Sequence, residues 1–403
     1  MRILMLAHRI PYPPHTGDKV RAFHVARYLA RRHDLTLAFL IDDARDRRGV
    51  DALRREVGEL EFAGLWRPWG LLKSLVGLAT GTPLTLAYFA SRQLRGRIAR
   101  RLSEAGYDLI YVSSSSMAHY VDGGASRPVV MDFVDVDSDK WTQFGHKTRP
   151  PLTWLYRTEG RRLRSYEAEV ARWARVCVLA TAAEEALLKS FAPWANTAVI
   201  PNGVDLDHLT PVARAVTDPT LIFTGAMDYT PNIDAVHHFC SDIYPRVRKE
   251  VPEVRFLIVG LNPPASVLRL GRLPGVVVTG AVPDVRPYYA RAAVCVAPLR
   301  LARGVQNKIL QAMAMGLPVV ATRRACEGIE ARPERDLLVE DDPEAFATRV
   351  VELLRDPVRR VGLGRSARSF VEAHHAWEAS LARLDALLRS AAVSQTAPEA
   401  SPA

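Results

Sequence analysis

The sequence is short of the features that mark several protein classes. Of its 403 residues only four are cysteine, and no two of them form a CxxC pair. They are Cys177, Cys240, Cys295 and Cys326. Scattered single cysteines argue against a disulfide framework or a zinc site, so we expect reduced thiols in a cytosolic protein. No uncharged apolar run approaches the roughly 20 residues that a membrane-spanning helix needs.

Targeting signals and nucleotide fingerprints are also missing. Met1 leads directly into an apolar, strand-like run, so we expect no signal peptide. No GxGxxG follows a predicted strand, which argues against a dinucleotide-binding site. No helix-turn-helix, RNA-recognition or zinc-finger pattern accompanies the positive charge, so we do not expect a nucleic-acid partner.

The charge that is present is unevenly distributed. The formal net charge is +10, and residues 1–205 hold 30 lysines and arginines against 22 acidic residues, whereas residues 206–403 hold 24 against 22. A basic N-terminal half suggests an anionic partner there, such as a membrane surface or a lipid diphosphate.

Short apolar runs alternate with helical segments along the whole chain, and this alternation predicts doubly wound α/β domains. The predicted strands include 3–7, 107–112, 129–132, 176–180, 221–224, 256–259, 276–279 and 293–298. We place an N-terminal domain at 1–210, a second domain at 211–375, a helix that returns to the first domain at 376–390 and a disordered tail at 391–403. Residues 358–389 are predicted to be helical throughout.

The stretch from Arg303 to Thr322, RGVQNKILQAMAMGLPVVAT, organises the second half. It predicts a helix from Gln306 to Met315 between two buried strands, because Gly316 suits the end of a helix and Pro318 prevents its continuation. Lys308 would then lie in the first turn, where free N–H groups and the helix dipole already favour an anion such as a diphosphate. An ordinary βαβ unit with a solvated lysine is the alternative.

This stretch resembles the C-terminal signature of the retaining, family 4 type glycosyltransferases, in which a Lys precedes a Glu-Ala-Met-Ala-x-Gly-x-Pro-Val-Val run. The matching residues are Lys308, Ala312, Met313, Ala314, Gly316, Pro318, Val319 and Val320. Within that family the chain most resembles the subgroup associated with exosortase (PEP-CTERM) exopolysaccharide loci. The resemblance implies the GT-B fold: two Rossmann-like doubly wound domains facing a central cleft.

The resemblance also implies roles for individual residues. Lys308 and Arg303 would stabilise the departing diphosphate, and Gln311 would contact the ribose. The backbone at Val282 would receive the base. Gly225 ends a predicted strand at the edge where ligands bind to open α/β sheets, so we include it in the donor site.

The N-terminal half supplies the remaining candidates. Gly17 lies in a loop that in the family faces the donor phosphates and the acceptor, and Lys19 and Arg21 could meet phosphates on the acceptor side. His119 is the match to a family histidine near the reacting sugar. Asp135 belongs to an Asp-x-Asp pattern that elsewhere suggests a metal, but the family typically works without one, so we expect this carboxylate to face the acceptor and predict neither a metal nor a cofactor.

Residues 64–89 combine exposed-looking tryptophans, Trp66 and Trp69, with apolar residues, and five arginines follow between Arg92 and Arg101. Tryptophan beside cations is typical of a contact with an anionic membrane, here the inner face of the cytoplasmic membrane. A core helix followed by a solvated basic helix is the alternative.

The expected function is transfer of a sugar, with retention, from a nucleoside-diphosphate sugar to a saccharide or a polyprenyl-diphosphate-linked saccharide in exopolysaccharide biosynthesis. The family has Glu where this chain has Arg303 and Gln311, which puts the sugar-side mechanism in question. Two alternatives therefore stay open: a catalytically weak sugar-nucleotide-binding subunit of a polysaccharide assembly complex, and a GT-B-fold nucleotide-sugar 2-epimerase.

Overall fold

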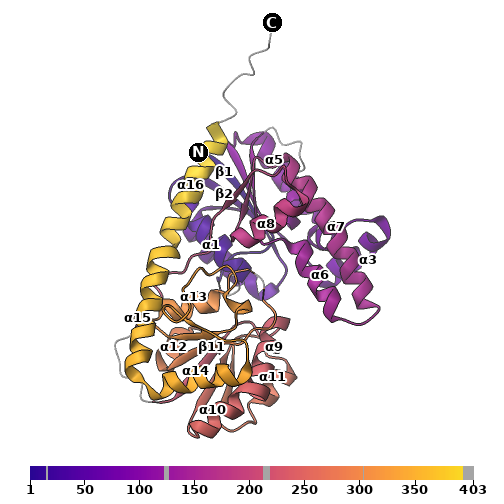
Figure 1. The fold of residues 1–403 in the computed structure, drawn as a ribbon. Coiled ribbons are helices and arrows are strands. Elements are labelled where there is room, and N and C mark those ends of the chain that lie inside the picture. Colours follow the sequence, from indigo (N-terminus) through magenta and orange to yellow (C-terminus); the bar gives the residue numbers. More distant parts are fainter. Residues whose placement is uncertain (15–16, 122–126, 212–217, 303, 394–403) are drawn as a thin grey trace. The chain divides into compact units, whose positions relative to one another are not determined.

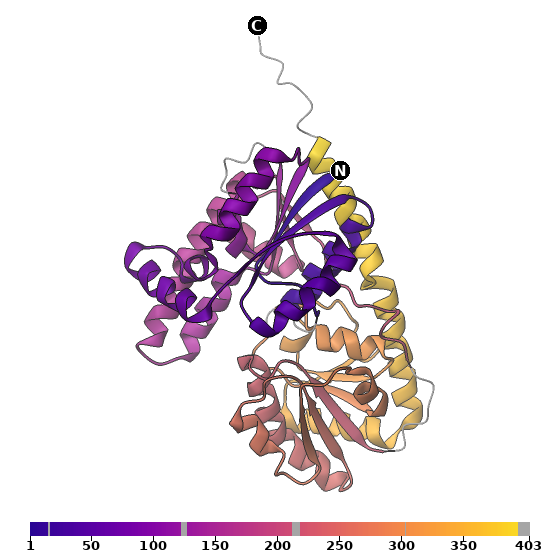
Figure 2. The ribbon, with the colours of Figure 1, turned by 180° about the vertical axis from the view of Figure 1, so that it is seen from behind.

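A computed structural model describes residues 1–14, 17–121, 127–211, 218–302 and 304–393 (Figures 1 and 2). The chain divides into two compact units. The first comprises Met1–Pro201 together with the chain from Leu381 onward, and the second comprises Asn202–Ser380. The predicted division at residue 210 lies within the second of these units.

The first unit is built on a seven-stranded parallel sheet in the order β3-β2-β1-β4-β5-β6-β7. Its strands are β1 (Arg2–Ala7), β2 (Asp34–Ile41), β3 (Glu59–Gly64), β4 (Leu109–Ser113), β5 (Val129–Val134), β6 (Val176–Leu179) and β7 (Thr197–Val199). The strand order reverses between β1 and β4, and open α/β sheets bind ligands beyond the carboxyl ends of the strands at such a point.

The helices of the first unit connect these parallel strands. They are α1 (Gly17–Ala30), α2 (Val50–Val57), α3 (Arg67–Thr80), α4 (Leu84–Phe89), α5 (Arg92–Glu104), α6 (Asp137–Lys147), α7 (Leu152–Trp173) and α8 (Ala182–Phe191). Helices α6 and α7 pack side by side and α3 lies next to them in both views. Buried Glu159 of α7 fastens α4 to this group, because its carboxylate accepts hydrogen bonds from the backbone N–H groups of Leu84 and Thr85 at 2.6 and 2.9 Å.

The second unit carries a six-stranded parallel sheet in the order β10-β9-β8-β11-β12-β13. Its strands are β8 (Thr220–Thr224), β9 (Arg255–Val259), β10 (Val276–Gly280), β11 (Val294–Ala297), β12 (Val319–Ala321) and β13 (Leu338–Val339). Its helices include α9 (Thr230–His238), α10 (Tyr244–Glu250), α11 (Ala265–Leu270), α12 (Arg286–Arg291), α13 (Asn307–Ala314), α14 (Pro343–Arg355) and α15 (Pro357–His374). Both units are therefore doubly wound α/β structures, which confirms the predicted fold class.

A helix begins within one residue of the predicted position 376, but residues 358–389 are not helical throughout, because His375 and Ala376 lie between two helices. Helix α15 ends at His374 and α16 (Trp377–Val393) begins three residues later. The break has a local cause: Ala376 pairs with Val204 as an isolated parallel bridge, and the backbone N–H of Val204 donates to the carbonyl oxygen of His375 at 2.8 Å. The part of α16 after Ser380 belongs to the first unit, where Asp385 contacts buried His33 at 2.5 Å.

Helix α16 continues to Val393, so residues 391–393 do not belong to a disordered tail, and residues 394–403 lie outside the described part.

All four cysteines are free thiols, as predicted. Among the described helices, none has the length and apolar character needed to cross a bilayer.

Candidate functional site

Three glycines meet at the carboxyl edge of the second unit's sheet. Gly225 follows β8, Gly260 follows β9 and Gly280 ends β10. The backbone N–H of Gly225 donates to Val259 at 3.0 Å, and that of Gly260 donates to Gly280 at 3.3 Å. The ends of the three strands predicted at 221–224, 256–259 and 276–279 thus meet at one edge, the edge to which Gly225 was assigned.

At two of these glycines the neighbouring atoms approach too closely for a side chain. A Cβ atom on Gly260 would lie 1.7 Å from the carbonyl oxygen of Gly225, and one on Gly225 would lie 2.6 Å from the side-chain nitrogen of Asn232. Any larger residue would push these loops apart. The edge is therefore built from main chain, which suits close approach of a phosphate.

Lys308 stands beside this edge in the first turn of α13. Its amine donates to Oδ1 of Asn232 at 3.0 Å and to Oε1 of Gln306 at 3.1 Å, and it lies 5.3 Å from the centre of the Phe223 ring. Gln306, the residue that precedes α13, has an extended backbone and no side-chain capping bond. The first turn therefore combines an ammonium group with helix N–H groups that carry positive partial charge.

Burial changes the protonation of this lysine. The amine is enclosed although the residue retains partial exposure, and desolvation lowers the pKa of Lys308 to about 8. The Cys295 thiol nearby stays neutral, because burial raises its pKa to about 12. An enclosed cation held by neutral amide oxygens is suited to receive an anion.

The buried phenol of Tyr289 joins β8, α12 and α13. Its hydroxyl lies 2.7 Å from Thr224 Oγ1 and 3.4 Å from both the carbonyl oxygen of Lys308 and Oε1 of Gln311. Gln311 is partly exposed one helical turn after Lys308. These contacts fix the first turn of α13 against the end of β8.

Two further residues, Val282 and Arg303, were predicted to bind the donor. Val282 follows β10 and packs, partly buried, against the core of the second unit. Arg303 lies outside the described residues, so its predicted contact with phosphate remains a prediction.

In the first unit, Gly17 begins α1, and the two cations that follow it are buried. Lys19 pairs with Asp46 at 2.6 Å. Arg21, only 2% exposed, donates to both carboxylate oxygens of Asp132, at 2.8 and 3.2 Å, and to the carbonyl oxygen of Ile200 at 2.9 Å. Burial alone would lower the pKa of Arg21, but the negative charge of Asp132 outweighs this effect, and the pKa of Arg21 is raised. The pair therefore ties α1 to β5 and to the end of this unit.

His119 lies in a short 3-10 turn, Ser115–Tyr120, after β4. Burial and then the charge of Arg95 lower its pKa to about 4, so the imidazole is neutral at physiological pH. Its ring packs on that of Tyr120 with 4.1 Å between centroids. A neutral imidazole can donate or accept a hydrogen bond but carries no charge for a phosphate.

Two strained residues mark the same edge of this sheet. Ser114 has φ 79° after β4 and Val134 has φ 65° at the end of the neighbouring strand β5. A β-branched residue rarely adopts this left-handed conformation, and such strain concentrates at functional sites. Asp135, the predicted acceptor-side carboxylate, follows Val134 and is partly buried.

Among the described residues, no group of three or more His, Cys, Asp or Glu side chains is arranged to hold a metal.

In the segment predicted to contact a membrane, residues 64–89, Trp66 is 71% exposed, whereas the side chain of Trp69 is not described. The arginines of α5 divide into two groups. Arg97 and Arg101 pair with carboxylates of β3, including a 2.7 Å contact between Arg101 and Glu61. Arg92, Arg95 and Arg100 are exposed.

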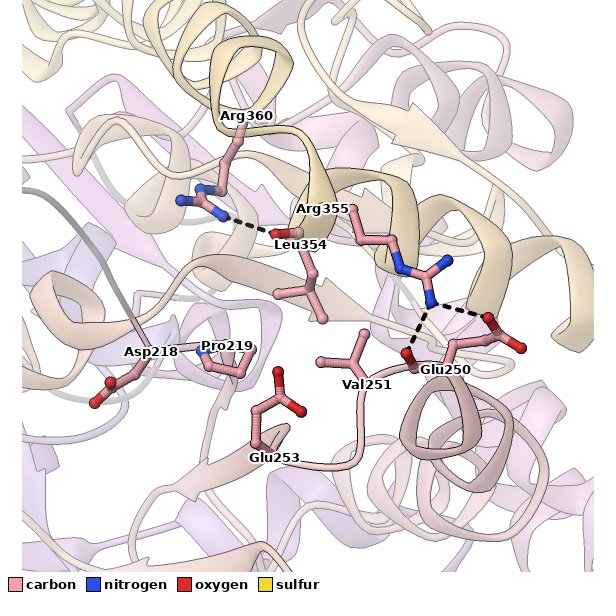
Figure 3. A pocket seen from close by; sticks show the side chains of 8 residues that line it. All are labelled: Asp218, Pro219, Glu250, Val251, Glu253, Leu354, Arg355 and Arg360. Carbon is pink, nitrogen blue, oxygen red and sulfur yellow. Dashed lines mark hydrogen bonds and ion pairs between the residues drawn. The ribbon is translucent and has the colours of Figure 1, made fainter.

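A hollow of about 190 Å³ lies elsewhere in the second unit (Figure 3). It is lined by Asp218, Pro219, Glu250, Val251, Glu253, Leu354, Arg355 and Arg360. Asp218 and Glu253 precede β8 and β9, so the hollow opens at the amino ends of the strands, opposite the glycine edge. Arg355 forms an ion pair with Glu250 there, with 3.0 Å between the charged groups. We therefore separate this hollow from the candidate site.

Sequence reasoning missed Asn232, Thr224 and Tyr289. The Pro-Asn pair at 231–232, at the start of α9, was the available signal for Asn232. Thr224 and Tyr289 are bonded across 65 positions of sequence, and no local pattern reveals such a contact.

Residues 218–356 match the family described as "Glycosyl transferases group 1". A Corynebacterium glutamicum protein named GDP-mannose-dependent monoacylated alpha-(1-6)-phosphatidylinositol monomannoside mannosyltransferase is 29% identical over 218 residues, 47% of this chain and 55% of that protein. The corresponding GDP-mannose-dependent mannosyltransferase of Mycobacterium tuberculosis is 27% identical over 225 residues, 50% of this chain and 57% of its own length. The chain thus spans about half the length of the relatives it matches.

Solved structures match nearly the whole chain at low identity. Sucrose-phosphate synthase from Thermosynechococcus elongatus superposes with a TM-score of 0.72 and 17% identity, covering 97% of this chain and 99% of that one. Anabaena Alr3699/HepE in complex with UDP-glucose gives a TM-score of 0.71 and 15% identity, covering 97% and 100%. The chain therefore has the GT-B fold, and the match to the glycosyl transferases group 1 family covers residues 218–356 of its second unit.

Proposed function

We propose that this chain is a glycosyltransferase that moves a sugar, with retention, from a nucleoside-diphosphate sugar to a saccharide or lipid-linked saccharide. The family match of the second unit supports the reaction class. The names of the mannosyltransferase relatives support a GDP-sugar donor and a lipid-linked acceptor, and the UDP-glucose complex of a structural neighbour supports a nucleotide sugar in this fold.

The observation that carries the proposal is Lys308 at the start of α13 beside the glycine edge. As the bond between sugar and diphosphate breaks, negative charge accumulates on the departing phosphate oxygens. A fixed ammonium group and helix N–H groups aimed at those oxygens stabilise that charge more in the transition state than in the ground state. This stabilisation requires no protein nucleophile.

The other candidates take subordinate roles in the proposal. Gly17 and Gly225 admit the diphosphate, the backbone at Val282 receives the base, Gln311 contacts the ribose and Arg303 adds a second cation. On the sugar and acceptor side, neutral His119 offers a hydrogen bond to the reacting sugar. Asp135 faces the acceptor, and Lys19 and Arg21 contribute there only if a ligand competes with their ion pairs to Asp46 and Asp132.

The proposed acceptor is a saccharide on a polyprenyl diphosphate, used in exopolysaccharide biosynthesis at the inner face of the cytoplasmic membrane. Exposed Trp66 and the exposed arginines of α5 support such a peripheral location, because an aromatic side chain beside cations suits an anionic lipid surface.

The test is to incubate the purified protein with GDP-mannose and with UDP-glucose and to measure nucleoside diphosphate by chromatography. A donor present at about 100 times its Kd should also stabilise the protein by about 2.7 kcal/mol in thermal unfolding. Slow release of GDP or UDP supports the transferase. Stabilisation by both donors and their nucleotides without any release supports the binding-subunit alternative, which arises because Arg303 and Gln311 stand where the family has Glu. No binding of either donor contradicts both.

A further inference from the structure

Asn232 has no role in the sequence prediction, yet the structure fixes its side chain in one orientation. It is buried in the first turn of α9, and its Nδ2 donates to the carbonyl oxygen of Ala226 at 2.8 Å while its Oδ1 accepts from the Lys308 amine at 3.0 Å. An ammonium group can only donate and a carbonyl can only accept, so the amide cannot be turned over. Gly225 closes against the same side chain.

The charge of Lys308 is left uncompensated by these contacts. Both of its hydrogen-bond acceptors, Asn232 and Gln306, are neutral amides, and no carboxylate of the described residues forms an ion pair with it. Asp234, the acidic residue of α9, instead pairs with Arg300 at 2.5 Å. A carboxylate at position 232 would satisfy the amine equally well in hydrogen bonding, but would neutralise it.

We propose that Asn232 is a positioning residue for the nucleotide diphosphate: it aims the Lys308 ammonium at the site while leaving its charge for the phosphates. This inference rests on the proposed function. Asn232 acts through Lys308, so its effect should be visible in the charge state of that lysine as well as in affinity.

Diphosphate binding should therefore take up a proton. Burial lowers the pKa of Lys308 to about 8, so near pH 8 only about half of the empty sites carry the ammonium. A bound diphosphate favours the charged form and raises this pKa. Of the other titratable groups around α13 and α9, burial raises the pKa of Cys295 to about 12 and also raises that of Tyr289, and His238 is paired with Asp242 at 2.7 Å. Arg368 of α15 binds the far end of α13 at Ala314.

The experiment is calorimetric titration of the full chain with GDP and with UDP at pH 8 in two buffers of different ionisation enthalpy. The difference in apparent binding enthalpy gives the protons taken up. We expect about half a proton per bound nucleotide for the parent, and a Kd that rises roughly fourfold from pH 7 to 8.5 as the amine loses its proton.

Asn232→Asp should abolish the coupling between nucleotide binding and proton uptake, because a carboxylate keeps Lys308 protonated before the nucleotide binds. We expect proton uptake near zero, a Kd at pH 7 about tenfold weaker, and a Kd constant within about twofold up to pH 8.5. Thr230→Asp is the matched control, since it adds the same charge at an exposed position of the same helical turn and should behave like the parent. Lys308→Arg should also show no proton uptake, because guanidinium stays protonated.

Asn232→Asp also loses the bond to Ala226, so folding is checked by thermal unfolding. If that variant does not fold, Asn232→Ala serves instead. Removal of an acceptor lowers the lysine pKa further, and proton uptake at pH 8 should then rise above that of the parent. Proton uptake equal to the parent's in the folded variant would overturn the inference while leaving the proposed function intact. A parent that binds neither GDP nor UDP would overturn the proposed function itself, and this inference with it.

Discussion

Two buried cations in this chain are held in opposite ways. Arg21 faces the carboxylate of Asp132 and donates to both of its oxygens, whereas Lys308 donates to the amide oxygens of Asn232 and Gln306, and no described carboxylate pairs with it. A buried cation that faces a carboxylate already has its charge neutralised, and removing either partner would leave an unpaired charge. A buried cation that lacks such a partner is the one suited to a mobile anion. At the scale of single residues, this contrast separates a structural ion pair from a candidate phosphate contact.

Gln311 offers a separate test at the same scale. Its Oε1 lies 3.4 Å from the Tyr289 hydroxyl, one turn after Lys308. If Gln311 accepts from a ribose hydroxyl, Gln311→Glu should tighten nucleotide binding by about 1 kcal/mol, because a carboxylate accepts more strongly than an amide. Gln311→Leu, the control of similar size without an acceptor, should weaken it. Calorimetry measures both, and weaker binding by Gln311→Glu would mean that position 311 faces phosphate rather than ribose.

At the scale of elements, the exposed arginines of α5 carry the membrane proposal. Arg97 and Arg101 are engaged by β3, so the exposed Arg92 and Arg100 should provide the attraction to lipid. Each cation near an anionic surface contributes about 1 kcal/mol, which salt reduces. We therefore expect Arg92→Glu with Arg100→Glu to lower sedimentation with phosphatidylserine vesicles at low salt.

The matched control for that experiment is a charge reversal in the second unit. Arg291→Glu together with Arg269→Glu changes net charge equally on exposed positions of the second unit and should leave sedimentation unchanged. If both double variants lost the same amount of sedimentation with the vesicles, the attraction would depend on overall charge and not on α5. No binding by the parent would contradict the peripheral location.

How well the sequence predicted each element depended on whether its determinants are local. Helix α13 was predicted within one residue at either end, because Gly316 and Pro318 act on their own neighbourhood. The bridge between Val204 and Ala376, which interrupts the helices between α15 and α16, was not predicted, because it joins distant parts of the chain.

The same reasoning explains the candidate site. Lys308 and the glycine edge were predictable, since strand ends of a parallel sheet meet at one edge. Lys19 and Arg21 were expected to meet phosphates, and their ion pairs with Asp46 and Asp132 could not be foreseen from sequence because those partners come from other elements. Asn232 was overlooked for the same reason, since its partner lies 76 positions away.

At the scale of the whole molecule, each of the two units is a complete parallel sheet with its own buried core. The sequence predicted both units from alternating strands and helices, which is a periodic property of the chain. It placed their division at residue 210, whereas the compact units divide after Pro201, because residues within 202–210 bond to α15 and to His375 and Ala376 after it.

The central claim is that Lys308 stabilises a departing nucleoside diphosphate, and steady-state turnover of Lys308→Ala tests it most directly. Release of GDP or UDP from the donor that the parent uses should fall by roughly 100-fold or more, while the Kd for that donor changes far less, because the charge on the leaving group is greatest in the transition state. Lys308→Arg, which keeps the cation, should retain more activity than Lys308→Ala. Turnover of Lys308→Ala equal to that of the parent would contradict the account.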